Sequence, residues 1–202
     1  MKKALLPLLV LAFSVSATAG TQSFTINFEQ YPGYTQITNQ YAGQYATFNN
    51  ALQLVVPDYD YFDYPPHSGS GVITNDPSNP IQVTFSTAPG TLGVNNITGW
   101  YVDPNGITVN GYNSKGALVA TFQGAPVIGA DLEFSLSTAQ AGTISYITIS
   151  DDTGSPDSEI VDDLSYQEVP EPDSLLIVCS GLVSAVGLAR LKMGRRKPPA
   201  TP

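Results

Sequence analysis

The stretch ITVNGYNSKGALVATFQG (Ile107–Gly124) decides the fold class, because it has the pattern of a β-hairpin. Ile107 and Val109 fall on one face of a first strand, since alternate residues of a strand point the same way. The residues NSKG (Asn113–Gly116) favour a turn, and the apolar segment Leu118–Phe122 follows them. The stretch therefore predicts two antiparallel strands joined by a tight turn.

Short segments of the same kind recur between residues 20 and 168, separated by turns rich in Gly, Pro and Asn. The further predicted strands are Ser23–Phe28, Ala51–Pro57, Gly71–Asn75, Ile81–Ser86, Asp131–Leu136, Ile144–Ser150 and Glu159–Tyr166. No segment of this region has a convincing helical pattern. The sequence therefore predicts an all-β domain, an antiparallel two-sheet sandwich of about nine strands, whose strand order stays open.

Both ends of the chain have the composition of targeting segments. Residues 1–19 combine two lysines, an apolar run and the small residues Ala17 and Ala19, which predicts a signal peptide cut by signal peptidase. The uncharged run Leu175–Ala189 precedes five basic residues, and it predicts a single transmembrane helix whose basic end stays in the cytoplasm. The alternatives are an N-terminal membrane anchor and a buried C-terminal helix.

The charge of the predicted domain excludes some partners. Residues 20–168 contain one basic residue, Lys115, and 15 acidic residues, which gives a net charge of −14. Binding to nucleic acid or to an anionic membrane surface requires clustered Lys and Arg. We therefore expect neither of these ligands for the domain. The only cysteine, Cys179, lies in the C-terminal apolar run, so no disulfide stabilises the domain.

Residues 169–197 resemble the PEP-CTERM sorting signal of Gram-negative bacteria. The resemblance is carried by Pro170, Glu171 and Pro172, by the hydrophobic stretch, and by a basic end that includes Arg195 and Arg196. It implies recognition by an exosortase-type protease that cuts near Pro-Glu-Pro, after transient anchoring in the inner membrane. It also implies association with exopolysaccharide at the cell surface or in the extracellular matrix. A short tail of residues 198–202 follows.

The domain itself resembles jelly-roll domains that precede such sorting signals, and this implies kinship, at the level of the fold, with carbohydrate-binding jelly rolls. Fold alone does not give function. The matching stretches are Ile37–Ala51, Tyr64–Ile73, Val109–Thr121 and Ile160–Tyr166.

The most unusual stretch is PDYDYFDYPPH (Pro57–His67), a proline-flanked loop in which aromatic and acidic residues alternate. Tyr59, Tyr61 and Tyr64 are candidates for stacking on sugar rings, whose hydroxyls would donate to the carboxylates. The alternative is an acidic loop whose rings cover a sheet edge. Trp100 is a further stacking candidate, although a sandwich of this size usually buries its only tryptophan.

A calcium ion is the cofactor that the sequence suggests. Glu29 follows the first predicted strand, and Asp162 and Asp163 lie in the last, so a clamp between these strands is conceivable. The jelly-roll resemblance implies the same arrangement. Adjacent strand residues point to opposite faces, so we expect only one of the two aspartates to reach such a site. The alternative is that either aspartate faces solvent.

Catalysis is not expected. His67 is the only histidine and lies among Pro and Gly, which favours a structural loop position over a metal ligand or catalytic base. The leading interpretation is an exported surface or matrix module associated with polysaccharide and able to bind carbohydrate. A structural matrix protein without a ligand is the alternative, and a polysaccharide-active enzyme is the third candidate.

Overall fold

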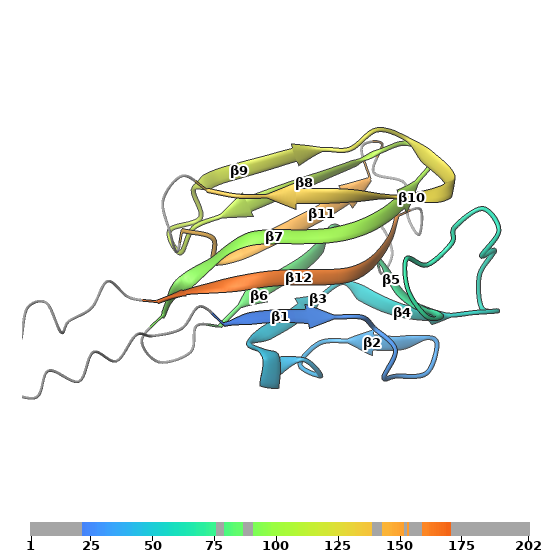
Figure 1. Cartoon of the computed structure of the whole chain (residues 1–202), viewed down its shortest axis with the longest axis horizontal. Coiled ribbons are helices and arrows are strands. Elements are labelled where there is room, and N and C mark those ends of the chain that lie inside the picture. The colour runs from blue at the N-terminus through green and yellow to red at the C-terminus, as the bar shows by residue number, and fades with distance from the viewer. Residues whose placement is uncertain are drawn as a thin grey trace, which may run out of the picture.

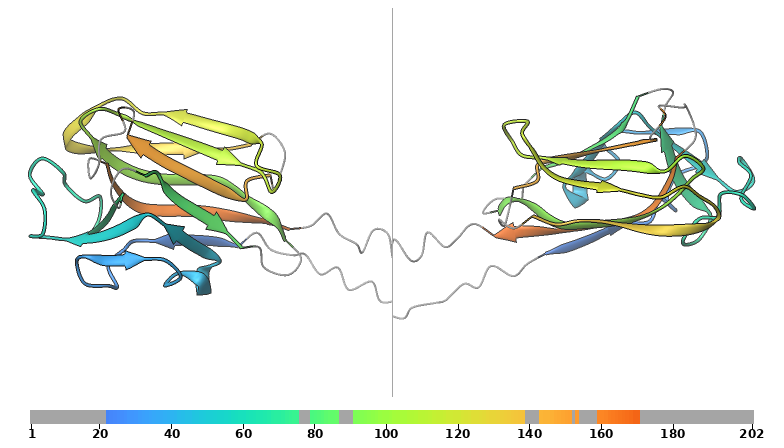
Figure 2. Two further views of the ribbon diagram at one scale, coloured as in Figure 1. Left: turned by 180° about the vertical axis from the view of Figure 1, so that it is seen from behind. Right: turned by 90° about the horizontal axis from the view of Figure 1, so that it is seen from above.

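The computed structural model describes residues 22–75, 79–86, 91–138, 143–151, 153 and 159–170. This part of the chain forms two antiparallel sheets that face each other across an apolar core (Figures 1 and 2). It contains no α-helix, only the short 3-10 helix η1, Ala42–Gln44. The predicted all-β, two-sheet antiparallel sandwich is confirmed. The finer resemblance to a jelly roll stays a prediction.

The larger sheet has seven strands, in the order β10-β7-β12-β5-β4-β2, and β1 also pairs with β12. Their bounds are β1 Ser23–Ile26, β2 Thr35–Ile37, β4 Ala51–Val55, β5 Gly71–Asn75, β7 Thr91–Asp103, β10 Val127–Leu136 and β12 Ile160–Pro170. The last strand, β12, is central: β7 pairs along one edge, while β5 and β1 share the other.

The smaller sheet has five strands, in the order β3-β6-β11-β8-β9. Their bounds are β3 Ala46–Asn49, β6 Ile81–Phe85, β8 Ile107–Tyr112, β9 Leu118–Gln123 and β11 Tyr146–Asp151. The predicted hairpin is confirmed as β8 and β9, which pair antiparallel. Its turn is closed by the side chain of Asn113, whose Oδ1 accepts hydrogen bonds from the N–H groups of Lys115 (2.9 Å) and Ala117 (3.0 Å).

The described residues contain twelve strands where about nine were predicted, and the most important omission is β7. This 13-residue strand contains Gly93, Asn95, Asn96 and Gly99, which are poor strand formers. Its regular alternation is also interrupted, because Asn96 has a φ of +49°. Pairing with β10 on one side and β12 on the other overrides these local preferences. The short strands β2 and β3 were also not predicted.

The last strand runs two residues past the predicted domain boundary at Glu168. Val169 and Pro170 pair with Gly93 and Thr91 of β7, so the first proline of the Pro-Glu-Pro motif lies at the end of a strand. The other predicted processing residues, Ala17, Ala19, Glu171, Pro172, Arg195 and Arg196, lie outside the described residues. The signal peptide and sorting segment therefore stay predictions. Within the described ranges, no helix is long and apolar enough to cross a membrane.

The core between the sheets is closed by aromatic side chains near the start of β1 and the end of β12. The ring of Tyr166 packs against Phe85 and Phe24, with centroid distances of 4.8 and 5.5 Å. Its hydroxyl donates a hydrogen bond to the backbone carbonyl of Gln44, the last residue of η1. Because Ser23 lies opposite Gln167, the two ends of the described chain lie side by side at one end of the sandwich (Figure 1).

Gly99 tests how tightly the sheets pack. A Cβ at Gly99 would lie 2.6 Å from two ring carbons of Phe134, which is fully buried. We expect Gly99→Ala to lower the free energy of unfolding by about 2 kcal/mol, because the ring must leave its packed position. At Gly43 a Cβ would meet nothing within 4 Å, so Gly43→Ala is the matched control with little effect. Urea denaturation measures both, and equal stabilities would contradict this packing.

Candidate functional site

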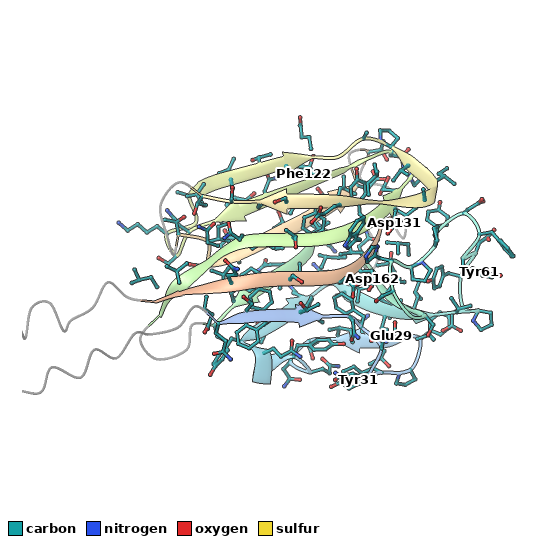
Figure 3. All side chains as sticks on the ribbon, in the orientation of Figure 1. Glu29, Tyr31, Tyr61, Phe122, Asp131 and Asp162 are labelled. Carbon is teal, nitrogen blue, oxygen red and sulfur yellow. The ribbon has the colours of Figure 1, made fainter. Side chains whose placement is uncertain are left out.

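A long loop covers one end of the outer face of the seven-stranded sheet. We call residues Pro57–Ser70, between β4 and β5, the strap; the part that contains Tyr61 projects from the sandwich (Figures 1 and 3). Beneath the strap lies a second, smaller apolar cluster, separate from the main core. It consists of buried Val72, Val102 and Ile160, with Leu54, Tyr59 and Tyr64 packed against it.

The second cluster explains why β5 is buried on both faces, a rare situation for a strand of an antiparallel sandwich. Ile73 faces the main core, while Val72 points to the opposite face and is covered by the strap. Tyr59 and Tyr64 are only partly exposed, and they cover the face of the sheet instead of the sheet edge of the alternative interpretation. The loop prediction for Pro57–His67 is confirmed, but two of its three tyrosines serve packing.

Three predicted calcium ligands hold the C-terminal end of the strap. Glu29 Oε1 accepts hydrogen bonds from the N–H groups of Ser70 (2.9 Å) and Gly71 (2.7 Å). Asp162 Oδ2 accepts from the N–H of Ser68 (2.9 Å), and Asp163 Oδ1 accepts from the Ser68 hydroxyl (3.0 Å). The structure thus gives these three carboxylates hydrogen-bond partners in the strap and at Gly71, the first residue of β5.

Both aspartates reach the same residue, against the expectation that only one would. Asp163 has a φ of +47°, and the pairing of β12 with β7 shifts register between Asp162 and Ser165. Such an irregularity suspends the alternation of side chains along a strand. The irregular segment lies between the two parts of β12 that pair with different strands on its other edge. Val161 pairs with Ile73 of β5, and Leu164 pairs with Ile26 of β1.

Gly71 permits the close approach of the segment after β1. A Cβ at Gly71 would lie 2.2 Å from the backbone oxygen of Phe28, so any other residue would push the two segments apart. The same segment carries Glu29 to the strap. The side-chain amide of Gln53 supports it from β4 by donating to the carbonyls of Phe28 and Tyr31.

His67 fixes the strap to the sheet through a ring stack and an acid. Its imidazole lies flat on the indole of Trp100, with a centroid distance of 3.7 Å and an interplanar angle of 4°. Its Nδ1 is hydrogen-bonded to Asp131 on β10. Trp100 is thus neither a core residue nor an open platform, because it is partly exposed and the imidazole covers one face. His67 therefore lies in a loop and holds the strap to the sheet, and the absence of a catalytic or metal-binding role stays a prediction.

The acidic residues of the site come from different elements. Asp131 lies on β10, Asp162 on β12 and Glu29 after β1, as Figure 3 shows. Trp100 on β7 lies between them, because it is paired with Glu133 of β10 on one side and with Asp162 on the other. A row of residues on the outer face therefore joins three strands beneath the strap.

Burial raises the pKa of Asp162 to about 7 from its ordinary value of 3.8. The backbone N–H of Ser68 opposes this rise, and the charge of Asp163 adds to it, as does that of Glu29. Asp162 is only 2% exposed, so desolvation dominates. Burial also raises the pKa of Tyr59, with contributions from Asp162 and Glu29.

Calcium binding at Glu29, Asp162 and Asp163 stays a prediction. Among the residues that the structure describes, no group of three or more His, Cys, Asp or Glu side chains is placed to hold a metal ion. The oxygens of these carboxylates face N–H and O–H donors of the strap. Calcium takes six to eight oxygen ligands, so a cation at this position would have to displace the strap.

The outer end of the strap carries the most exposed aromatic rings of the site. Tyr61 is 41% exposed and Phe62 is 74% exposed, and their ring centroids lie 4.2 Å apart. We call this pair the aromatic tip. The N–H of Phe62 donates to the side chain of Asp60 (3.2 Å), and the carbonyl of Asp63 accepts from the N–H of Gly129 on β10 (2.7 Å). The tip is therefore held from both sides.

Sequence reasoning found part of the site. It identified Tyr61, which is exposed, and the three carboxylates that hold the strap. It did not identify Phe62, although the residue stands in the same alternating stretch, because only tyrosines were taken as stacking candidates. It also gave no signal for Asp131, since only the fold brings β10 to His67.

The sequence matches no protein-family model and no curated protein. Among solved structures, the K2 cleaved adhesin domain of Lys-gingipain is 15% identical, with a TM-score of 0.45 over 72% of this chain and 99% of that one. A carbohydrate binding module of family 29 is 8% identical, with a TM-score of 0.41 over 72% of this chain and 89% of that one. Likeness at this level carries no information on function.

The raised pKa of Asp162 predicts a pH dependence of stability. Unfolded Asp162 loses its proton near pH 4, whereas the folded protein keeps it until about pH 7, so the native state binds more protons between these values. The contribution of Asp162 to stability is therefore complete below pH 4 and is lost as the pH rises to 7. Its size is on the order of 4 kcal/mol, which is the difference between a pKa of 3.8 and one of about 7 expressed as a free energy.

Asp162→Asn isolates this contribution from that of the other acids. We expect the wild-type protein to lose more stability than the variant between pH 4 and 7 in urea denaturation, because the amide does not titrate. Parallel curves for the two proteins would show that Asp162 ionises normally in the folded state.

Trp100 is the only tryptophan, so its fluorescence reports on the strap. His67→Ala should shift the emission to longer wavelength, because water reaches the uncovered indole, and should cost about 1 kcal/mol of stability from the lost ring stack. His67→Phe is the matched control: it keeps a flat ring on the indole but cannot bond Asp131. An emission spectrum unchanged by His67→Ala would contradict the stacked geometry.

Proposed function

We propose that this chain is an exported β-sandwich module of the cell surface or extracellular matrix that binds carbohydrate through the aromatic tip. The observation that carries the proposal is the exposure of Tyr61 and Phe62 on a loop whose other end is fixed to the sheet. Exposed aromatic rings cost a soluble domain free energy unless they serve a ligand, and sugar rings offer flat apolar faces of matching size.

The fixed strap makes such a site effective. Ordering a flexible loop on binding costs affinity, and a loop that is already bonded at Ser68, His67 and Asp63 avoids most of that cost. The tip therefore presents two rings in a set geometry. Tyr34 is 65% exposed and donates its hydroxyl to the carbonyl of Asp58 (3.4 Å), which adds a third ring near the start of the strap.

Binding is favoured over catalysis at this site. A polysaccharide-active enzyme needs two carboxyl groups that are open to the substrate. Asp162 has a suitably raised pKa but lies under the strap with 2% exposure, and His67 is engaged by both Trp100 and Asp131. The described site therefore offers aromatic faces to a ligand, while Asp162, its carboxyl group with a raised pKa, stays covered.

Export and sorting are the cellular part of the proposal. They rest on the signal-peptide pattern of residues 1–19 and on the PEP-CTERM resemblance of residues 169–197. We infer that signal peptidase and an exosortase-type protease process the chain, which the inner membrane holds only transiently. The domain is then delivered to the surface or to the surrounding polysaccharide.

A glycan array tests the binding function. Replacing Tyr61 and Phe62 together by Ala should weaken binding to any selected glycan at least tenfold, or about 1.4 kcal/mol, because the stacking area is lost. Leu118→Ala is the matched control, since Leu118 is 56% exposed on β9 of the other sheet. Thermal melting checks that both variants fold. An array without selective hits would favour the structural matrix protein instead.

A further inference from the structure

Carboxylates flank the aromatic tip along the strap. Asp58, Asp60 and Asp63 are all exposed, and they bracket Tyr61 and Phe62 in the sequence. The strap contains no Lys or Arg. The surface around the two rings is therefore acidic as well as aromatic, and any ligand that stacks there meets carboxylates at the edges of the rings.

Hydrogen bonds order the part of the strap that carries the aromatic tip. Asp60 Oδ1 accepts from the N–H of Phe62 (3.2 Å), and the Asp60 carbonyl accepts from the N–H of Tyr64 (3.0 Å), so a tight turn contains the tip. Asp63 is tied to β10 through its carbonyl, and the N–H of Asp58 donates to the carbonyl of Val55 (2.7 Å). The Asp60 carboxylate is thus bonded within the tip, whereas that of Asp58 accepts from the N–H of Val55 (3.4 Å) at the end of β4.

The charge of the whole domain selects among ligands for this surface. The net charge of −14 between residues 20 and 168 repels uronic acid polymers, sulfated glycans and a second copy of the domain. A neutral glycan gains the stacking contact alone. A glycan with protonated amino groups gains stacking, attraction of the ammonium to the ring faces, and pairing with carboxylates.

We propose that the aromatic tip binds a glycan that carries free amino groups, such as a partly deacetylated amino-sugar polymer. This inference rests on the proposed carbohydrate-binding function and names the chemical class of its ligand. The rings supply the preference for a sugar over a simple polycation, and the aspartates supply the preference for the amino form over the acetylated one.

Two hexasaccharides of the same backbone test the inference: fully deacetylated glucosamine hexamer and its N-acetylated form. Their binding to the full-length chain is measured by titration calorimetry at about pH 6, where the amino groups are largely protonated. We expect the amino form to bind at least tenfold more tightly at low salt. The difference should shrink in about 0.5 M NaCl, because salt screens exposed charges.

Variants separate the two parts of the surface. Asp60→Asn combined with Asp63→Asn should remove most of the preference for the amino form and leave the weaker binding of the acetylated form unchanged. An Asn side-chain oxygen still accepts the hydrogen bond from the Phe62 N–H, so the turn is kept. Glu133→Gln is the control, because it removes a charge from β10 outside the strap. Tyr61→Ala with Phe62→Ala should abolish binding of both hexamers.

The outcomes distinguish this inference from the proposed function. Equal binding of the two hexamers, or tighter binding of the acetylated one, overturns the amino-group assignment and leaves carbohydrate binding intact. Selective array hits confined to acidic glycans also overturn the amino-group assignment and leave carbohydrate binding intact. Oligolysine that competes as strongly as the amino hexamer shows that the site recognises charge alone, which overturns the assignment to a glycan. An absence of binding to every glycan removes the proposed function and this inference together.

Discussion

The pairing of β12 with β7 is the interaction on which both the sandwich and the site depend. It brings the last described strand into the centre of the larger sheet, next to Trp100 and Val102. Asp162 is the direct partner of Trp100, and Ile160 is the direct partner of Val102. The register of this one strand pair therefore places both the aspartate that bonds the strap and two apolar residues beneath it. Because β1 also pairs with β12, the sheet closes only after nearly the whole domain has been made, which is typical of slow-folding β proteins.

The strap shows how an acidic domain without disulfides manages a cluster of carboxylates. Three carboxylates close to one another repel, and burial of one of them raises the cost. Backbone N–H groups and a serine hydroxyl supply the compensating positive dipoles, and those of Ser68 and Ser70 come from the strap. The part of the strap that carries Tyr61 and Phe62 extends outward from these contacts, so one segment both anchors the loop and exposes the two rings.

The sequence predicted those parts of the molecule that depend on local pattern. The hairpin of β8 and β9 was predictable because turn residues separate two strand-forming segments. Strand β7 was not, since Gly99 is favoured by the ring of Phe134, a residue 35 positions later that local patterns do not connect to it. Glu29, Asp162 and Asp163 were singled out as calcium ligands, and their bonds to the strap were not predicted, since no periodicity signals the irregular backbone at Asp163. Strand β7 and the partners of the carboxylates therefore depend on contacts between residues far apart in the sequence, which local patterns do not reveal.

The placement of the chain ends has a mechanical consequence. Gln167 and its partner Ser23 lie at one end of the sandwich, whereas the strap projects from the other (Figures 1 and 2). A pull between a ligand on the strap and a tether at the end of β12 runs along that strand and loads its perpendicular hydrogen bonds to β7 and β1 together, in shear. A pull between Ser23 and Gln167 would instead open the same ladder one bond at a time. The ladder thus resists tension best in the direction in which the proposed function, a tethered binding module, would stretch the domain.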